Sequence, residues 1–173
     1  MQRSEQLRPL SRQHHIALVL AKTLRQWQEV DPSDAEQRAV ADACYRFWAV
    51  ELIPHFRGEE EALLGRWGRP GTDPVATRVL QEHVAIHRVA QRLGRALADR
   101  DTDAAWDEAQ RLGDCVRAHV RFEERTWLPA LEAELDERAL TEGREAMAHA
   151  LDTDAAEAAL PPRPEPERLP SHD

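Results

Sequence analysis

Three short breaks divide most of the chain into four long segments of helical periodicity. They are DPSD at residues 31–34, GRPGTDP at residues 68–74 and RDTD at residues 100–103. Proline, glycine and aspartate end helices and cap the next ones. Between the breaks, apolar residues recur every three or four positions, and we find no alternation typical of strands. The sequence therefore predicts an all-α protein.

The breaks also give approximate bounds for the helices. Asp31 or Ser33 would cap the second helix, and Asp73, with Pro74 at the first helical position, would start the third. Pro54 lies inside the second helix and should kink it, because proline lacks the amide donor. The expected helices cover about residues 11–30, 33–67, 74–99 and 103–129, with a shorter one over about residues 136–149. Four long helices joined by short loops predict an up-down-up-down four-helix bundle.

The chain divides into a predicted bundle over residues 1–150 and a tail over residues 151–173. Its length of 173 residues is that of one domain. The tail ends in LPPRPEPERLPSHD, which is rich in proline and polar residues. This composition is typical of disordered segments, so we expect the tail to be disordered.

Composition excludes several classes of function. The net charge of −9 and the absence of a basic stripe argue against a nucleic-acid partner. No apolar segment is long enough to span a membrane or to act as a signal peptide. The two cysteines, Cys44 and Cys115, lie among apolar residues and do not make a disulfide framework. We therefore expect a cytoplasmic protein without membrane contact, and the 5 tryptophans and acidic balance are compatible with a homodimer.

Histidines start pairs at a spacing of four residues on three of the expected helices. The pairs are His55 with Glu59, His83 with His87, and His119 with Glu123. Residues four apart lie on one helix face, roughly 6 Å apart along the axis. The two side chains of a pair can therefore converge on one ion or on two neighbouring ions.

Each pair continues the apolar stripe of its own helix. The stripes contain Trp48, Leu52 and Leu63 in the second helix, Leu80, Val84, Ala90 and Leu97 in the third, and Leu112, Val116 and Trp127 in the fourth. Polar side chains on three core stripes should meet in the interior. Buried charges are costly unless something neutralises them, so the pattern indicates bound ions.

The first helix offers His14 or His15 as a further ligand. His14 shares a face with Leu10 and Ala17, whereas His15 aligns with Ser11, so His14 is preferred. The candidate metal ligands are then His14, His55, Glu59, His83, His87, His119 and Glu123. Seven ligands exceed one tetrahedral zinc site and suit two ions that share bridging carboxylates. Imidazole with carboxylate suits iron, manganese or zinc.

The ordered series of a histidine on the first helix, then HFRGE, HVAIH and HVRFE, resembles the hemerythrin-like, or HHE cation-binding, family over about residues 10–130. The resemblance implies a four-helix bundle with a non-haem di-iron centre, so the expected cofactor is two iron ions. By position, Glu59 and Glu123 would bridge the irons, and the five histidines would be terminal ligands. One iron would keep an open position for dioxygen.

The chain departs from respiratory hemerythrins at one ligand position. Those proteins have an aspartate five residues after the last histidine, where this chain has Glu124. Glu123, at four residues, is better placed, because position five turns about 140° away from the face. The spacing is more similar to that of the bacterial HHE domains.

The leading functional hypothesis is a protein that binds dioxygen or a related small ligand such as nitric oxide, as sensor, carrier or iron and oxidative-stress protein. The first alternative is a di-iron oxidase or peroxide-consuming enzyme, which would need a proton donor such as Tyr45, the only tyrosine in the sequence. The second alternative is a structural metal-binding module, which would be redox-silent.

Overall fold

The computed structural model describes residues 4–67, 71–151 and 160–170. Over these residues every regular element is a helix, which confirms the predicted all-α class. The α-helices are α1 (Arg8–Gln28), α2 (Asp34–Phe47), α3 (Ile53–Gly58), α4 (Gly65–Trp67), α5 (Pro74–Asp99), α6 (Thr102–Phe122), α7 (Leu128–Glu134) and α8 (Glu137–Leu151). The other elements are the π-helical segments η1 (Trp48–Leu52), η2 (Glu59–Leu64) and η3 (Glu123–Trp127), and the 3-10 helix η4 (Pro166–Arg168).

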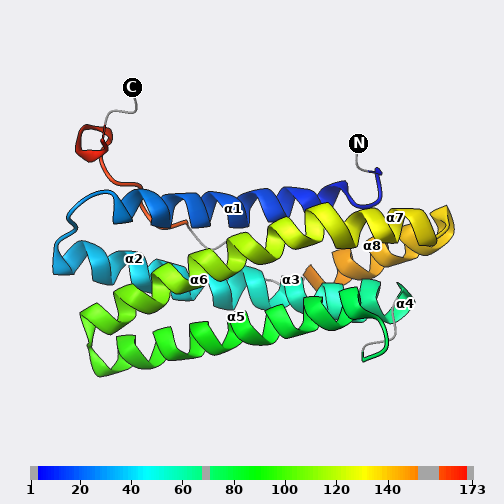
Figure 1. Ribbon diagram of the computed structural model, residues 1–173, viewed down its shortest axis with the longest axis horizontal. Helices are drawn as coiled ribbons and strands as arrows, with labels where there is room; N and C mark the ends of the chain where they lie inside the picture. Colours follow the sequence, from blue (N-terminus) through cyan, green and yellow to red (C-terminus); the bar gives the residue numbers. More distant parts are fainter. Residues whose placement is uncertain (1–3, 68–70, 152–159, 171–173) are drawn as a thin grey trace.

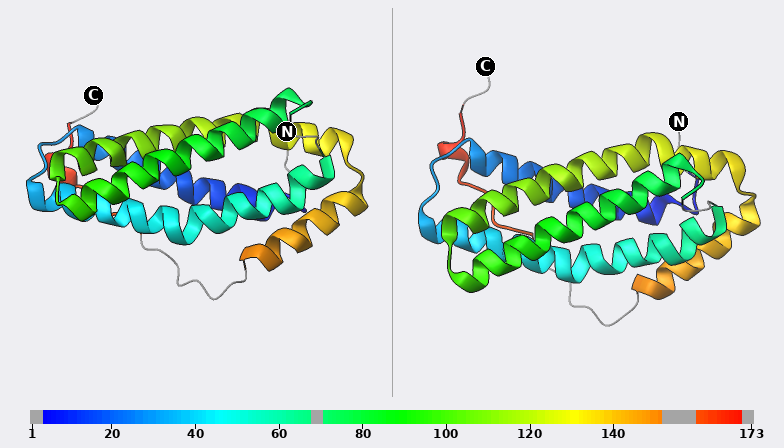
Figure 2. Two further views of the ribbon diagram at one scale, coloured as in Figure 1. Left: turned by 90° about the horizontal axis from the view of Figure 1, so that it is seen from below. Right: turned by 60° about the horizontal axis from the view of Figure 1, so that its bottom comes forward.

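The helices form four long rods that lie side by side (Figure 1). The first rod is α1, the second runs from α2 to α4 through η1 and η2, the third is α5, and the fourth comprises α6, η3 and α7. α6 contacts α1, α2 and α5. Figure 2 shows α8 lying along the second rod, where it contacts α3 and η2. None of the helices described combines the length and hydropathy needed to cross a bilayer.

Aspartate or serine side chains cap the starts of several of these helices. Ser33 caps α2 and forms a capping box with Glu36. Asp73 caps α5, with Pro74 in its first turn, and Asp101 caps α6. The caps predicted from the breaks in the sequence are confirmed, with Ser33 taking the role left open for the second helix.

The second and fourth rods are continuous because π-helical segments join their α-helices. Pro54 is the second residue of α3, which begins immediately after the end of the π-helical segment η1. The other two segments begin at Glu59 and Glu123. Such single-turn π segments often occur at functional sites.

Two apolar clusters fill the bundle, and a layer of buried polar side chains separates them. Along α1, Leu10 belongs to one cluster and Ala17 to the other, and the buried His14 lies between them. The same order holds along α5 for Val79, His83 and Ile86. The fold thus holds a polar cross-section between two hydrophobic ends.

Residues 160–170 pack against the rest of the chain, which corrects the expectation of disorder for this part of the tail. Trp27 Nε1–H donates a hydrogen bond to the carbonyl oxygen of Pro162 over 2.7 Å. The guanidinium group of Arg168 pairs with the Glu36 carboxylate over 2.5 Å. The rest of the predicted disordered tail, residues 152–159 and 171–173, lies outside the described residues.

Candidate metal centre

Six of the seven predicted ligands meet in the polar layer of the bundle. They are His14 of α1, His55 of α3, Glu59 of η2, His83 of α5, His119 of α6 and Glu123 of η3. Each is at most 5% exposed. His15, the alternative to His14, is exposed.

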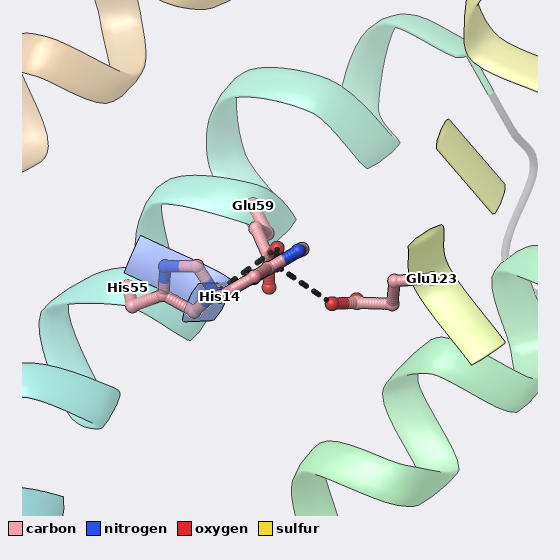
Figure 3. A group of neighbouring side chains, drawn as sticks. All are labelled: His14, His55, Glu59 and Glu123. Carbon is pink, nitrogen blue, oxygen red and sulfur yellow. Dashed lines mark hydrogen bonds and ion pairs between the residues drawn. The ribbon is translucent and has the colours of Figure 1, made fainter. Parts of the chain in front are cut away.

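The first group of converging side chains is drawn in Figure 3 and comprises His14, His55, Glu59 and Glu123. Nε2 of His14 lies 3.4 Å from Oε1 of Glu59 and 3.1 Å from Oε2 of Glu123. Nε2 of His55 lies 3.2 Å from Oε1 of Glu59. One candidate ligand atom from each residue lies within 4.8 Å of the others, which is close enough for one ion to contact all four.

The second group comprises Glu59, His83, His119 and Glu123. Nε2 of His83 lies 3.3 Å from Oε2 of Glu59 and 3.9 Å from Oε1 of Glu123. Nε2 of His119 lies 3.3 Å from Oε1 of Glu123. These four ligand atoms also lie within 4.8 Å of one another.

Glu59 and Glu123 belong to both groups, and each turns one carboxylate oxygen toward each group. Oε1 of Glu59 faces His14 and His55, and Oε2 faces His83. Oε2 of Glu123 faces His14, and Oε1 faces His119. A carboxylate in this position can contact ions on both of its sides.

Several polar atoms in this layer are buried without a hydrogen-bond partner among the described residues. They are Oε2 of Glu59, both carboxylate oxygens of Glu123, Nε2 of His83 and Nε2 of His119. A buried polar group left unpaired costs about 1–3 kcal/mol, and a charged one costs more. Imidazole nitrogen and carboxylate oxygen are donors that iron, manganese and zinc accept, so bound metal would satisfy these atoms. The residues fit a metal centre.

The other ring nitrogen of each histidine also has a partner. Nδ1 of His14 lies 2.7 Å from Oε1 of Glu124, and Nδ1 of His55 lies 3.0 Å from Oε1 of Gln13. In the second group, Nδ1 of His83 lies 2.8 Å from Oε1 of Glu60, and Nδ1 of His119 lies 3.0 Å from Oε2 of Glu82. Each Nδ1–H donates to the oxygen opposite it when Nε2 faces the centre. Such partners fix the tautomer and orientation of metal-binding imidazoles.

The two halves of the chain supply these residues in the same order. In each half, a glutamine or glutamate stands directly before the first histidine. A second histidine follows further along the half, with glutamates four and five residues after it. The first half supplies Gln13, His14, His55, Glu59 and Glu60, and the second supplies Glu82, His83, His119, Glu123 and Glu124. The contacts also correspond, since Gln13 contacts His55 as Glu82 contacts His119, and Glu60 contacts His83 as Glu124 contacts His14. The one chemical difference between the corresponding residues is glutamine at position 13 and glutamate at position 82.

Electrostatics couple the protons of the centre to its carboxylates. Burial lowers the pKa of His83, but the carboxylates of Glu59 and Glu60 raise it to about 9. The pKa of His14 is likewise raised well above its usual value, because Glu123, Glu124 and Glu59 outweigh burial. Burial raises the pKa of Glu59, but the surrounding imidazoles hold it well below its usual value. His14 and His83 therefore hold their protons more tightly in the metal-free protein, and metal ions would displace those protons.

His87 lies in neither of the two groups found among the described residues. It is half-buried, and its Nδ1 accepts a hydrogen bond of 3.0 Å from Nε1–H of Trp48. The ring of Phe56 stacks on His83 at a centroid distance of 4.1 Å and meets the edge of His87 at 5.5 Å. The structure therefore brings His83 to the centre and holds His87 against Trp48 and Phe56.

The apolar stripe predicted for the third helix needs correction. Val84 is 47% exposed and Leu80 is half-buried, although both were expected on the core face. The buried face of α5 instead passes through Val79, His83 and Ile86. His83 belongs both to the predicted apolar stripe and to the observed buried face, whereas His87 belongs only to the predicted stripe. This difference explains why only His83 of the pair is brought to the centre.

The sequence did not predict most of the residues that contact the histidine Nδ1 atoms. Gln13 and Glu82 stand directly before His14 and His83, but each contacts a histidine of another rod. The repeated order of the residues in the two halves is the signal that would have identified them.

Buried imidazoles and carboxylates converge here, and several of their inward-facing atoms have no hydrogen-bond partner among the described residues, which defines this protein as a metal-binding helical protein. The family model of the hemerythrin HHE cation binding domain matches residues 6–131. The chain therefore belongs to this family, in agreement with the resemblance carried by its motifs. No curated protein and no solved structure matches the chain.

Proposed function

We propose that this chain is an up-down-up-down four-helix bundle with a di-iron centre, and that it binds dioxygen or a related diatomic ligand such as nitric oxide. The observation that carries the proposal is the position of Glu59 and Glu123 between two pairs of histidines. His14 and His55 would hold one iron, His83 and His119 the other, and the two glutamates would be shared. Iron held in this way would supply reversible binding of diatomic molecules or electron exchange with them.

A small cavity next to the centre supports a diatomic ligand. Its volume is about 20 Å³, which is close to the minimum that holds one water molecule. It touches one histidine of each group, His55 and His119, and the ring of Phe56. The rest of its lining is mostly apolar: Gln13, Ile16, Ala17, Phe47, Glu51, Leu52, Val116 and Val120. Such a cavity favours a small uncharged molecule over a larger polar substrate.

The sensor or carrier role ranks above the enzymatic alternative because Tyr45, the proton donor named for an oxidase, is not among the residues that line the cavity. Tyr45, the candidate donor, has its ring against Trp48 and close to Gly94. His87, the remaining predicted ligand, would have to leave its hydrogen bond with Trp48 to reach an iron. The proposed ligand set therefore uses four histidines.

The proposal is tested by loading the purified chain with ferrous iron without oxygen and recording the visible spectrum as oxygen or nitric oxide is added and removed. A charge-transfer band that follows the added gas reversibly is expected. A band that forms with oxygen and persists would overturn the proposal in favour of an oxidase. Bound iron that responds to neither gas would overturn it in favour of a structural site.

Two variants make this test specific. Glu123→Ala removes a carboxylate shared by both groups and should abolish the response to gas. His15→Ala removes an exposed imidazole next to His14 and should leave the response unchanged. Equal loss in both variants would contradict the assignment of the site.

A further inference from the structure

The two proposed iron sites share the same kinds of inner ligand but have different partners around them. Each site has two histidine Nε2 atoms and both shared glutamates. The difference lies at the Nδ1 atoms, where three histidines donate to a carboxylate and His55 donates to the neutral amide of Gln13. The inference below rests on the proposed di-iron centre.

We propose that Gln13 is a positioning residue that would make the two irons electronically unequal, so that the iron held by His14 and His55 would have the higher reduction potential and would accept the first electron from an external one-electron donor. The corresponding residue in the other half of the chain is Glu82, which contacts His119 as Gln13 contacts His55. The substitution of an amide for a carboxylate at this one position gives the two sites different Nδ1 hydrogen-bond acceptors.

The physical reason is the effect of an Nδ1 partner on the donor strength of Nε2. A carboxylate that accepts Nδ1–H draws the proton toward itself and leaves the ring more basic. A more basic imidazole stabilises the more highly charged ferric ion. A neutral amide accepts the same hydrogen bond but adds no negative charge, so it stabilises the ferric ion less.

The partners of the carboxylates do not cancel this difference. Glu82 also accepts a hydrogen bond of 2.7 Å from Arg78, and Glu124 accepts one of 2.7 Å from the Ser11 hydroxyl. The Arg78 contact weakens the effect of Glu82 on His119, but an arginine-paired carboxylate remains a stronger acceptor than an amide. The iron held by His83 and His119 keeps two carboxylate partners, whereas the other iron keeps one.

Gln13 also lies where its charge matters for the proposed ligand. It lines the small cavity that touches His55 and His119. The cavity lining already includes the carboxyl side chain of Glu51, and an amide at position 13 adds no second charge beside an incoming uncharged molecule. Gln13 thus contacts His55 and also contributes to the wall of the cavity.

The test is a reductive titration of the iron-loaded protein without oxygen, monitored by electron paramagnetic resonance and by potential. The wild type should take up two electrons in separate steps, with a half-reduced state that gives a paramagnetic signal. Gln13→Glu should lower the potential of the first step, and Glu82→Gln should raise that of the second. Each change should be at least about tenfold in the equilibrium constant, which is 59 mV for one electron.

Either variant gives the two sites the same set of Nδ1 partners. The difference between the two reduction potentials should therefore become smaller in both, because Gln13→Glu lowers the higher potential and Glu82→Gln raises the lower one. Gln81→Glu adds the same charge at an exposed position of α5 and controls for charge alone. Glu61→Gln removes a charge from an exposed residue and controls for its loss. Circular dichroism and iron content show whether each variant folds and is loaded.

The outcomes separate this inference from the proposed function. Fewer than two irons in the wild type would overturn the di-iron centre and the inference together. Two irons that are reduced in one step, with no shift in either variant, would overturn the inference alone. Equal shifts in Gln81→Glu and Gln13→Glu would also overturn it, because a general charge effect would then be sufficient.

Discussion

Glu59 and Glu123 are both fully buried, and each is the first residue of a π-helical segment. In both rods the next glutamate, Glu60 or Glu124, reaches the Nδ1 atom of a histidine on a different rod. Each pair of adjacent glutamates thus supplies one carboxylate inside the centre and one around it. The relationship explains why a buried helix carries consecutive carboxylates.

Removing a shared carboxylate should lower the bound metal content more than removing one histidine does. Glu59→Gln and Glu123→Gln should each weaken binding of both ions, because each carboxylate contacts both groups. His83→Ala should leave the ion held by His14 and His55 in place. The measurement is the metal-to-protein ratio after loading and desalting, by elemental analysis.

His15→Ala serves as the matched control for these variants, because His15 is exposed and adjacent to His14. It should retain the full metal content. A greater loss in His83→Ala than in Glu123→Gln would contradict the shared role of the carboxylates.

Substitution of His87 distinguishes the sequence-based ligand set from the proposed one. His87→Ala should retain both ions, because its Nδ1 is engaged by Trp48 and neither group contains it. Iron content and the spectrum of the iron-loaded protein provide the measurement. Loss of one ion would show that His87 rotates to the metal, as the motif alone predicts.

The metal-free protein should lose stability as pH rises from about 6.5 to about 9. The pKa of His83 is raised from 6.5 to about 9, so its proton binds more tightly in the folded state. That contribution is fully present below pH 6.5 and is lost as pH passes the folded pKa, with a magnitude on the order of 3 kcal/mol. Urea unfolding at several pH values measures it.

His83→Ala and His15→Ala provide the comparison for the pH experiment. The decline over this pH range should be smaller in His83→Ala, whereas His15→Ala should retain it. Metal binding should show the opposite trend, strengthening as pH rises, because bound metal displaces protons. An unchanged unfolding midpoint across the range in the wild type would contradict this account.

The described part of the tail should contribute to stability. Trp27→Phe removes the hydrogen bond to the Pro162 carbonyl and should cost about 1 kcal/mol, or about 2–4 °C in Tm. Trp106→Phe is the control, because this half-buried ring packs on the same apolar cluster. Thermal unfolding compares them. Equal losses in the two variants would mean that the tail contact adds nothing beyond ring packing.

Most of the buried side chains that meet in the polar layer were predictable, because each depends on the face of a single helix. His55 with Glu59 and His119 with Glu123 lie four apart, so one helix face carries both members. The same reasoning selected His14 over His15, and the structure places His14 inside and His15 outside. Local periodicity was sufficient for these residues.

Contacts between rods could not be predicted from the periodicity of each helix. Gln13 meets His55 and Glu82 meets His119 only because the rods pack at a particular register. The prediction of the buried face of α5 was wrong for a related reason, because several faces of that helix carry apolar residues. Only packing against the other rods selects the face with Ile86 over the face with Val84. Likewise, the tail composition indicated disorder, but Trp27 and Glu36 provide partners for residues 160–170.

Anomalous diffraction at the iron edge from crystals of the iron-loaded protein tests the central claim most directly. The account predicts two peaks, one beside His14 and His55 and the other beside His83 and His119, with Glu59 and Glu123 contacting both. A single peak, or two peaks that do not share the glutamates, would contradict it.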